Sequence, residues 1–266
     1  MVTLGCIATP GLTPAQYLSV ARTADAAGLE ELWIWEDCFK ESGIATAGAI
    51  LGTTTRLRVG IGILPVPLRN VALTAMELAT LAGMFPGRLV PGIGHGVQDW
   101  MEQVGARVSS PLTLLREHAE ALRALLRGDR LTVSGRYVTL DDVALDWPPA
   151  EPPPVLSAGQ GPRTLRLAGE VGDGVVLTGG TSPADARHAI GLVEEGRAAA
   201  GRTGPFTVVT FIALPAQARA RGAAAMADYL QPWIDAGTTT LAIIPVHGDT
   251  EGVVTWLAED VRPLLA

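Results

Sequence analysis

His95 is the side chain in this sequence that is best suited to acid–base chemistry. It lies in LVPGIGHGVQDW (residues 89–100), where an apolar run enters a loop with glycine at every second place. The pKa of an unperturbed histidine is near neutrality, so the imidazole can both give and take a proton. The Gly-x-Gly-x-Gly spacing differs from a dinucleotide fingerprint, which also requires a first strand–helix unit before it. Two interpretations stay open: a catalytic histidine, or a tight bend.

Other titratable groups are weaker candidates. Glu36 and Asp37 lie in WIWEDCF (residues 33–39), where either carboxylate can hydrogen-bond a ligand or cap a helix. The adjacent Cys38 has no histidine neighbour that would activate it. His247 is a second candidate for acid–base work. We expect Glu117, His118 and His188 on the solvated faces of helices.

Two short segments have the composition of anion-binding loops. In each, small and glycine residues precede a proline that opens a helix, so free N–H groups and the helix dipole favour negative charge. The residues are Ser157, Gly159, Gln160 and Gly161 in the first loop and Thr178, Gly179 and Gly180 in the second. Together they predict a site for a phosphate-bearing ligand, and ordinary helix capping is the alternative. Neither loop has the Gly-Lys-Ser/Thr of a Walker motif.

Gly60 and Gly62 remove side chains from the end of a predicted strand. This permits a bulge or the close approach of a flat ligand. The glycines fit a crowded barrel interior equally well.

Composition and absent motifs exclude several classes of function. The formal net charge of −7 argues against a nucleic-acid partner. The sequence has no HExxH, CxxC or GxSxG motif and no acidic cluster, so we expect no metal site. Only two cysteines, no signal peptide and no run of about 18 apolar residues predict a cytoplasmic protein without a membrane partner.

Short apolar runs alternate with amphipathic segments in an order that can position these residues. We predict strands at residues 2–8, 31–35, 57–64, 88–93, 155–158, 174–177, 207–214 and 239–244. Helices are expected at residues 13–27, 44–51, 71–84, 111–126, 163–170, 183–200, 218–230 and 251–264, with Thr13 as an N-cap and Gly28 as a stop.

Eight strand–helix units predict an α/β fold, a (β/α)₈ TIM barrel over residues 1–266 as one domain. A hairpin with its turn at Ser134-Gly135 and a proline-rich stretch interrupt the rhythm, which indicates an insertion at about 128–154 between strands four and five. An open, doubly wound sheet is the alternative, but residues 9–11 are no fingerprint loop. In a barrel the chemistry lies at the carboxyl ends of the strands, where all the candidate loops fall.

Several blocks together resemble the bacterial luciferase-like family of flavin and deazaflavin oxidoreductases. They are residues 21–33, 36–37, 54–63, 77–81, 87–94 and 167–175. Within that family the sequence looks most similar to the branch that uses coenzyme F420. The resemblance implies hydride transfer between the deazaflavin and a small organic substrate, in a homodimer.

The resemblance also implies roles for individual residues. A non-prolyl cis peptide at Gly62-Ile63 would press on one face of the cofactor ring, with Asp37 at its polar edge and Gly94 and His95 near ring or substrate. His95, or alternatively Asp37, would supply acid–base chemistry. The cofactor phosphate would lie against Ser157, Ala158, Gly159, Gln160, Gly161, Thr178, Gly179 and Gly180. The substrate, or a dimer partner, would contact Trp35, Phe39, Leu64, Val66 and Trp100.

The sequence departs from the family pattern in places. Many relatives have histidine where Cys38 stands and proline where Val71 stands, and the chain is shorter than most. Three other hypotheses stay open: an FMN-dependent monooxygenase that needs a flavin reductase, a non-catalytic flavin-binding barrel, and a barrel lyase or isomerase.

Overall fold

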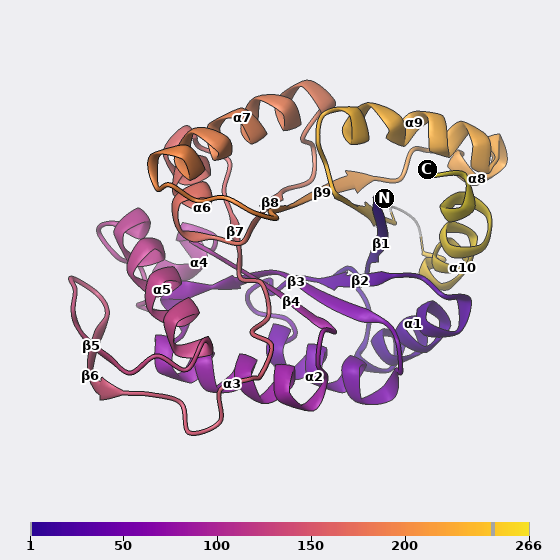
Figure 1. The fold of residues 1–266 in the computed structure, drawn as a ribbon. Coiled ribbons are helices and arrows are strands. Elements are labelled where there is room, and N and C mark those ends of the chain that lie inside the picture. Colours follow the sequence, from indigo (N-terminus) through magenta and orange to yellow (C-terminus); the bar gives the residue numbers. More distant parts are fainter. Residues whose placement is uncertain (1, 246–247, 266) are drawn as a thin grey trace.

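Eight parallel strands close into a barrel in the computed structural model, which describes residues 2–245 and 248–265 (Figure 1). Around the barrel each strand pairs with its neighbour in chain order, and the last strand closes against the first. The strands are β1 (Thr3–Ile7), β2 (Glu31–Ile34), β3 (Arg58–Pro65), β4 (Leu89–Gly94), β7 (Leu156–Ala158), β8 (Gly174–Leu177), β9 (Thr207–Ala213) and β10 (Thr240–Ile244). The prediction of a (β/α)₈ barrel is therefore confirmed.

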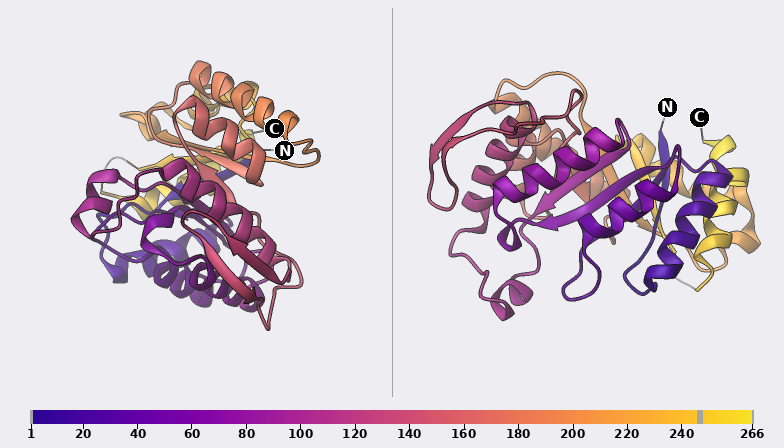
Figure 2. Two further views of the ribbon diagram at one scale, coloured as in Figure 1. Left: turned by 90° about the vertical axis from the view of Figure 1, so that its left-hand side faces the viewer. Right: turned by 90° about the horizontal axis from the view of Figure 1, so that it is seen from below.

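Helices surround the barrel and follow its strands (Figures 1 and 2). They are α1 (Pro14–Ala27), α2 (Gly43–Thr53), α3 (Val71–Met84), α4 (Gln98–Gln103), α5 (Pro111–Leu126), α6 (Pro162–Val171), α7 (Pro183–Ala199), α8 (Ala218–Arg221), α9 (Ala223–Asp235) and α10 (Thr250–Trp256). A short 3₁₀ turn, η1 (Val66–Leu68), connects β3 to α3. No helix among residues 2–245 and 248–265 is long and apolar enough to cross a membrane.

Local signals set the ends of α1 as expected. The Thr13 side chain accepts from the Gln16 N–H while the Gln16 side chain accepts from the Thr13 N–H, which is a capping box. Gly28 ends the helix with φ of 81°, a left-handed conformation that glycine adopts without a Cβ clash.

Three helical predictions differ from the structure. The helix expected at 218–230 divides into α8 and α9 at Gly222, whose φ of 88° cannot continue a helix. The last helix changes to π and 3₁₀ turns after Trp256. The six-residue helix α4 was not predicted, because it is too short to display a helical period.

The insertion forms a two-stranded antiparallel sheet outside the barrel, β5 (Leu131–Ser134) and β6 (Thr139–Val143) (Figure 1). Glu117 on α5 fixes the turn, since its carboxylate accepts the backbone N–H groups of Arg136, Tyr137 and Val138 at 2.8–3.0 Å. This partner explains why Glu117 is half-buried and does not lie free on a solvated face.

The expectation for His118 was wrong. It is 1% exposed, because it lies four residues after Leu114 and three after Leu115 on the buried stripe of α5. Burial, with the charge of Arg69 nearby, lowers the pKa of His118 to about 4. His188, on α7, is exposed as expected.

The barrel interior is crowded at Gly60 and Gly62. A Cβ at Gly60 would collide with the Trp33 ring, and one at Gly62 would come 2.6 Å from Cζ of Phe211. Trp33 and Phe211 pack edge to face, with ring centroids 5.8 Å apart. The glycines of β3 therefore make room for the protein's own aromatic side chains.

Candidate active site

A cavity of about 640 Å³ opens at the carboxyl ends of the barrel strands. It is lined by residues from β2, β3, β4, β7, β8, β9 and β10 and the loops after them: Trp35, Glu36, Asp37, Gly62, Ile63, Pro65, Gly94, His95, Gly96, Val97, Trp100, Ala158, Gly159, Gln160, Gly161, Thr164, Thr178, Gly179, Phe211 and Ile244. Most of the residues singled out in the sequence thus meet in one place.

One wall of the cavity comes from the end of β2. The Trp35 ring packs against the Phe211 ring, with the ring centroids 5.7 Å apart and an interplanar angle of 32°. Phe211 is an inward-facing residue of β9, and Trp35, one residue beyond β2, continues the inward side of Trp33, because alternate residues of an extended chain face the same side. Asp37 is half-buried at the mouth, beside Cys38, whose pKa is raised by burial and by the Glu36 and Asp37 charges.

The adjoining wall comes from β3 and β4. The Gly62-Ile63 peptide is cis, as the family resemblance implied, and the β3–β4 register shifts between Ile61 and Leu64. The Ile63 side chain covers Gly94, where a Cβ would meet it at 3.1 Å. A second non-prolyl cis peptide, Cys38-Phe39, was not predicted.

His95 is held at the rim by a hydroxyl. Its Nε2 lies 3.2 Å from Oγ1 of Thr164, in the first turn of α6. Its Nδ1 is buried and makes no hydrogen bond of normal geometry within the described part of the chain. Burial lowers the pKa of His95, an effect that the Pro111 backbone partly offsets. The lowered pKa therefore leaves the imidazole neutral at pH 7.

The first anion loop leads into an open helix terminus. Gly161 is the N-cap of α6, and no side chain caps the first turn. The first turn of a helix has N–H groups that lack intrahelical partners, and they favour an anion. The α7 terminus differs, because the Ser182–Asp185 capping box already occupies it. The α6 end is thus the better anion site.

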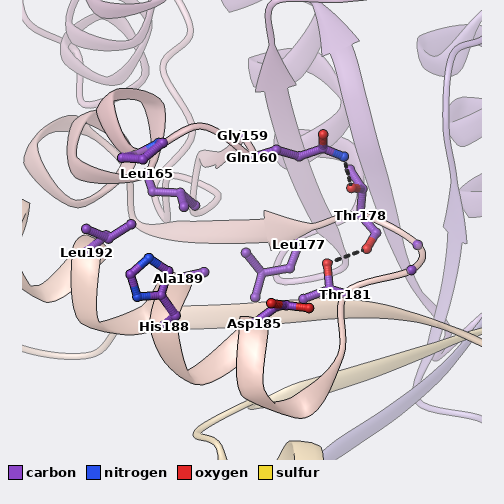
Figure 3. A pocket seen from close by; sticks show the side chains of 13 residues that line it. Gly159, Gln160, Leu165, Leu177, Thr178, Thr181, Asp185, His188, Ala189 and Leu192 are labelled. Carbon is purple, nitrogen blue, oxygen red and sulfur yellow. Dashed lines mark hydrogen bonds between the residues drawn. The ribbon is translucent and has the colours of Figure 1, made fainter.

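Gln160 joins the two loops by donating from Nε2 to Oγ1 of Thr178 at 2.6 Å (Figure 3). A smaller hollow of about 360 Å³ lies beyond this bridge and is lined in part by Gly180, Asp185 and His188 (Figure 3). Among the described residues, no lysine or arginine lines the main cavity. The donors available to an anion there are therefore uncharged, and they include backbone N–H groups, the Thr164 and Thr178 hydroxyls and the Gln160 amide.

Some predicted site residues lie elsewhere. Ser157 is buried, its Oγ has no partner among the described residues, and it does not line the cavity, because the inward positions of β7 are Leu156 and Ala158. Gly180 lines only the smaller hollow. His247 lies outside the described residues.

Two of the predicted substrate contacts line the cavity, Trp35 and Trp100. Phe39 is 63% exposed, whereas Leu64 and Val66 are buried, and none of the three lines it.

Sequence reasoning did not select Thr164, Phe211 or Ile244. Phe211 and Ile244 follow the inward residues Val209 and Ala242 by two, so strand alternation carried a signal for both. Thr164 had no such signal, since its contact with His95 spans 69 positions.

Known proteins are similar to this chain in sequence and in fold. Residues 2–255 match the model of the luciferase-like monooxygenase family. The chain is 30% identical over 193 residues to a 5,10-methylenetetrahydromethanopterin reductase of Methanolobus tindarius, covering 73% of this chain and 58% of the relative. It is 30% identical over 205 residues to an F420-dependent glucose-6-phosphate dehydrogenase of Kineococcus radiotolerans, covering 71% of this chain and 60% of the relative. It thus spans about three fifths of these relatives.

Solved structures share the architecture at lower identity. A coenzyme F420 dependent tetrahydromethanopterin reductase from Methanopyrus kandleri superposes with a TM-score of 0.86 at 20% identity, covering 100% of this chain and 99% of the other. An F420-dependent secondary alcohol dehydrogenase in complex with an F420-acetone adduct gives 0.87 at 20% identity, with the same coverage. At this identity the likeness establishes the barrel fold.

Proposed function

Since this chain belongs to the luciferase-like monooxygenase family, we propose that it is an F420-dependent oxidoreductase. It transfers a hydride between the deazaflavin cofactor and a small organic substrate. The observation that carries the proposal is the cavity of about 640 Å³, which joins an apolar slot to an uncapped helix terminus. A flat ring with a phosphate-bearing tail fits that combination. The F420-dependent relatives named above support the choice of cofactor.

The residues of this chain fit such a cofactor in two regions. Asp37, Gly62, Ile63, Gly94 and His95 surround the slot for the ring. Gly159, Gln160 and Gly161 at the start of α6 would hold the tail phosphate together with Thr178 and Gly179, and Ala158 lines the same cavity. Ser157 and Gly180 then act by shaping the loops, since neither lines the cavity.

Bound F420 supplies the hydride chemistry, and the protein binds, orients and excludes water. His95 is the proposed proton-transfer residue, because it lines the cavity and its lowered pKa keeps the imidazole neutral at pH 7. Thr164 orients it through Nε2. Asp37 is the alternative proton carrier at the mouth.

The walls of the cavity favour an apolar substrate. The apolar side chains of Trp35, Val97, Trp100, Phe211 and Ile244 line the cavity. Aromatic and aliphatic side chains bind such ligands by removing apolar surface from water.

We further propose that the enzyme is a cytoplasmic homodimer without nucleic-acid or membrane partners. Free cysteines at positions 6 and 38 are consistent with a reducing compartment. Leu73, Met76 and Met84 are exposed on α3, and Trp147 is 86% exposed on the neighbouring insertion. An apolar face of this kind supports self-association, which analytical ultracentrifugation tests.

A fluorescence titration tests the cofactor. Purified protein is added to F420 and, in parallel, to FMN, and the cofactor emission is followed. We expect saturable binding of F420 and weaker binding of FMN. Preferential FMN binding would transfer the proposal to a monooxygenase that needs a flavin reductase. Failure to bind either cofactor at micromolar protein would reject both.

A further inference from the structure

A buried ion pair lies at the cavity wall, where Glu36 is a lining residue. The Arg69 guanidinium meets both carboxylate oxygens of Glu36, with Nη1–Oε1 at 2.5 Å and Nη2–Oε2 at 2.7 Å. The two side chains are only 13% and 8% exposed. The Gly43 N–H also donates to Oε2 of Glu36, at 2.6 Å. A two-pronged contact of this kind fixes both distance and orientation.

The pair joins two walls of the cavity that are far apart in the sequence. Glu36 lies between Trp35 and Asp37, at the end of β2. Arg69 follows η1, four residues after Pro65 at the end of β3. Holding Glu36 to Arg69 therefore fixes the segment that carries Trp35 and Asp37 against the segment that carries Gly62-Ile63 and Pro65.

The surroundings of Arg69 leave Glu36 dependent on it. Nε of Arg69 also lies 3.5 Å from Oε2 of Glu77 on α3, so one guanidinium serves two carboxylates. His118, on α5, is buried, and the Arg69 charge contributes to the lowering of its pKa. Removal of Arg69 leaves the Glu36 carboxylate buried without a counter-ion, a state that a protein relieves by moving the segment, admitting water or taking up a proton.

From these contacts we infer that Arg69 is a positioning residue of the active site, which acts through Glu36 to hold the Trp35–Asp37 segment in its binding geometry. The effect on cofactor affinity rests on the proposed function. The effect on the segment itself does not, and the two can be measured separately.

Cys38 provides a readout of the segment that needs no cofactor. It lies two residues after Glu36 and is half-buried, while Cys6, the other cysteine of the chain, is fully buried. The rate at which Cys38 reacts with 5,5′-dithiobis(2-nitrobenzoate) therefore reports how accessible the segment is to a reagent in solution. We expect Arg69→Met to raise this rate about tenfold in a protein that remains folded by circular dichroism.

Electrostatics act in the opposite direction, which makes the expected acceleration diagnostic. The Arg69 charge lowers the pKa of the Cys38 thiol, so its loss by itself would reduce the thiolate fraction and slow labelling. Arg69→Lys keeps the positive charge but cannot make the two-pronged contact with Glu36. It should therefore also accelerate labelling, by a smaller factor. This variant tests the inference if Arg69→Met does not fold. The matched control is Arg107→Met, which removes an exposed ion pair with Glu102.

F420 binding by the same variants completes the experiment. Arg69→Met should weaken binding about tenfold, and Arg107→Met should leave both affinity and labelling unchanged. Unchanged labelling of Cys38 in both Arg69 variants would overturn the inference. So would faster labelling together with unchanged F420 affinity. If the unmodified protein binds neither F420 nor FMN, the proposed function fails, and the labelling rates still decide whether Arg69 holds the segment.

Discussion

Nε2 of His95 lies 3.2 Å from Oγ1 of Thr164, so the loop after β4 is joined to the first turn of α6. This contact places the proposed proton-transfer residue beside the proposed phosphate site. A Cβ at Gly159 would collide with Thr164, so the glycine in the anion loop is what permits Thr164 to occupy this position. The relationship is the basis for the first two predictions.

Replacing His95 with alanine should lower turnover about a hundredfold or more, the usual contribution of a general acid or base. Cofactor affinity should change much less than turnover, because Asp37, Gly62, Ile63 and Gly94 still surround the ring slot and the loops after β7 and β8 are unaltered. Thr164→Val, which removes only the hydroxyl, should lower turnover by at most about tenfold, in line with one neutral hydrogen bond. Steady-state kinetics with parallel cofactor titrations separate the effects. Unchanged turnover in His95→Ala would leave the interpretation of a tight bend.

The rate should fall on the acid side of the pH profile. Burial lowers the pKa of His95, so the imidazole is neutral at pH 7 and gains a proton only at pH values below the ordinary 6.5. Protonation removes the lone pair that accepts a proton, so kcat should decline as the pH falls through that lowered pKa. The decline of kcat at low pH should be absent from the residual activity of His95→Gln. If the decline persists in this variant, another group is responsible for the titration.

His118 should make the protein sensitive to acid. Its pKa is about 4 in the folded chain and 6.5 when unperturbed, so the unfolded chain binds the proton more tightly. Folding stability is therefore lost as the pH falls from 6.5 towards 4, by up to about 3 kcal/mol. Urea unfolding of His118→Leu at pH 7.5 and 4.5 should show a smaller loss than the unmodified protein shows. His188→Leu, on an exposed face of α7, is the control. Equal losses in all three proteins would contradict the prediction.

Gly60→Ala should destabilise the barrel, because the new Cβ would overlap the Trp33 ring. The expected loss is about 1–3 kcal/mol or more, the usual cost of overpacking a core. Gly83→Ala is the matched control: nothing lies within 4 Å of its Cβ position on α3, and alanine favours a helix. The midpoint of chemical denaturation should fall for Gly60→Ala and should stay the same or rise for Gly83→Ala. A neutral Gly60→Ala would mean that the interior has free space there.

Much of the fold followed from local patterns in the sequence. Apolar runs and helical periods predicted all eight barrel strands, and the bounds of α3 and α5 agree with the structure. The eight strand–helix units were enough to predict closure. The candidate loops also met as expected, because barrel topology brings every strand's carboxyl end to one face.

Side-chain neighbours across the barrel were decided by the tertiary structure. Ser157 was expected to hold a phosphate, yet strand alternation turns it away from the cavity. Phe211 reaches Trp35, and Arg69 reaches Glu36, only because the strands close in this register. Helical periods and caps act over about four residues, so the sequence by itself determined the elements and their order. Contacts between distant residues depend on how strand faces and loops meet after closure, and only the folded chain defines that.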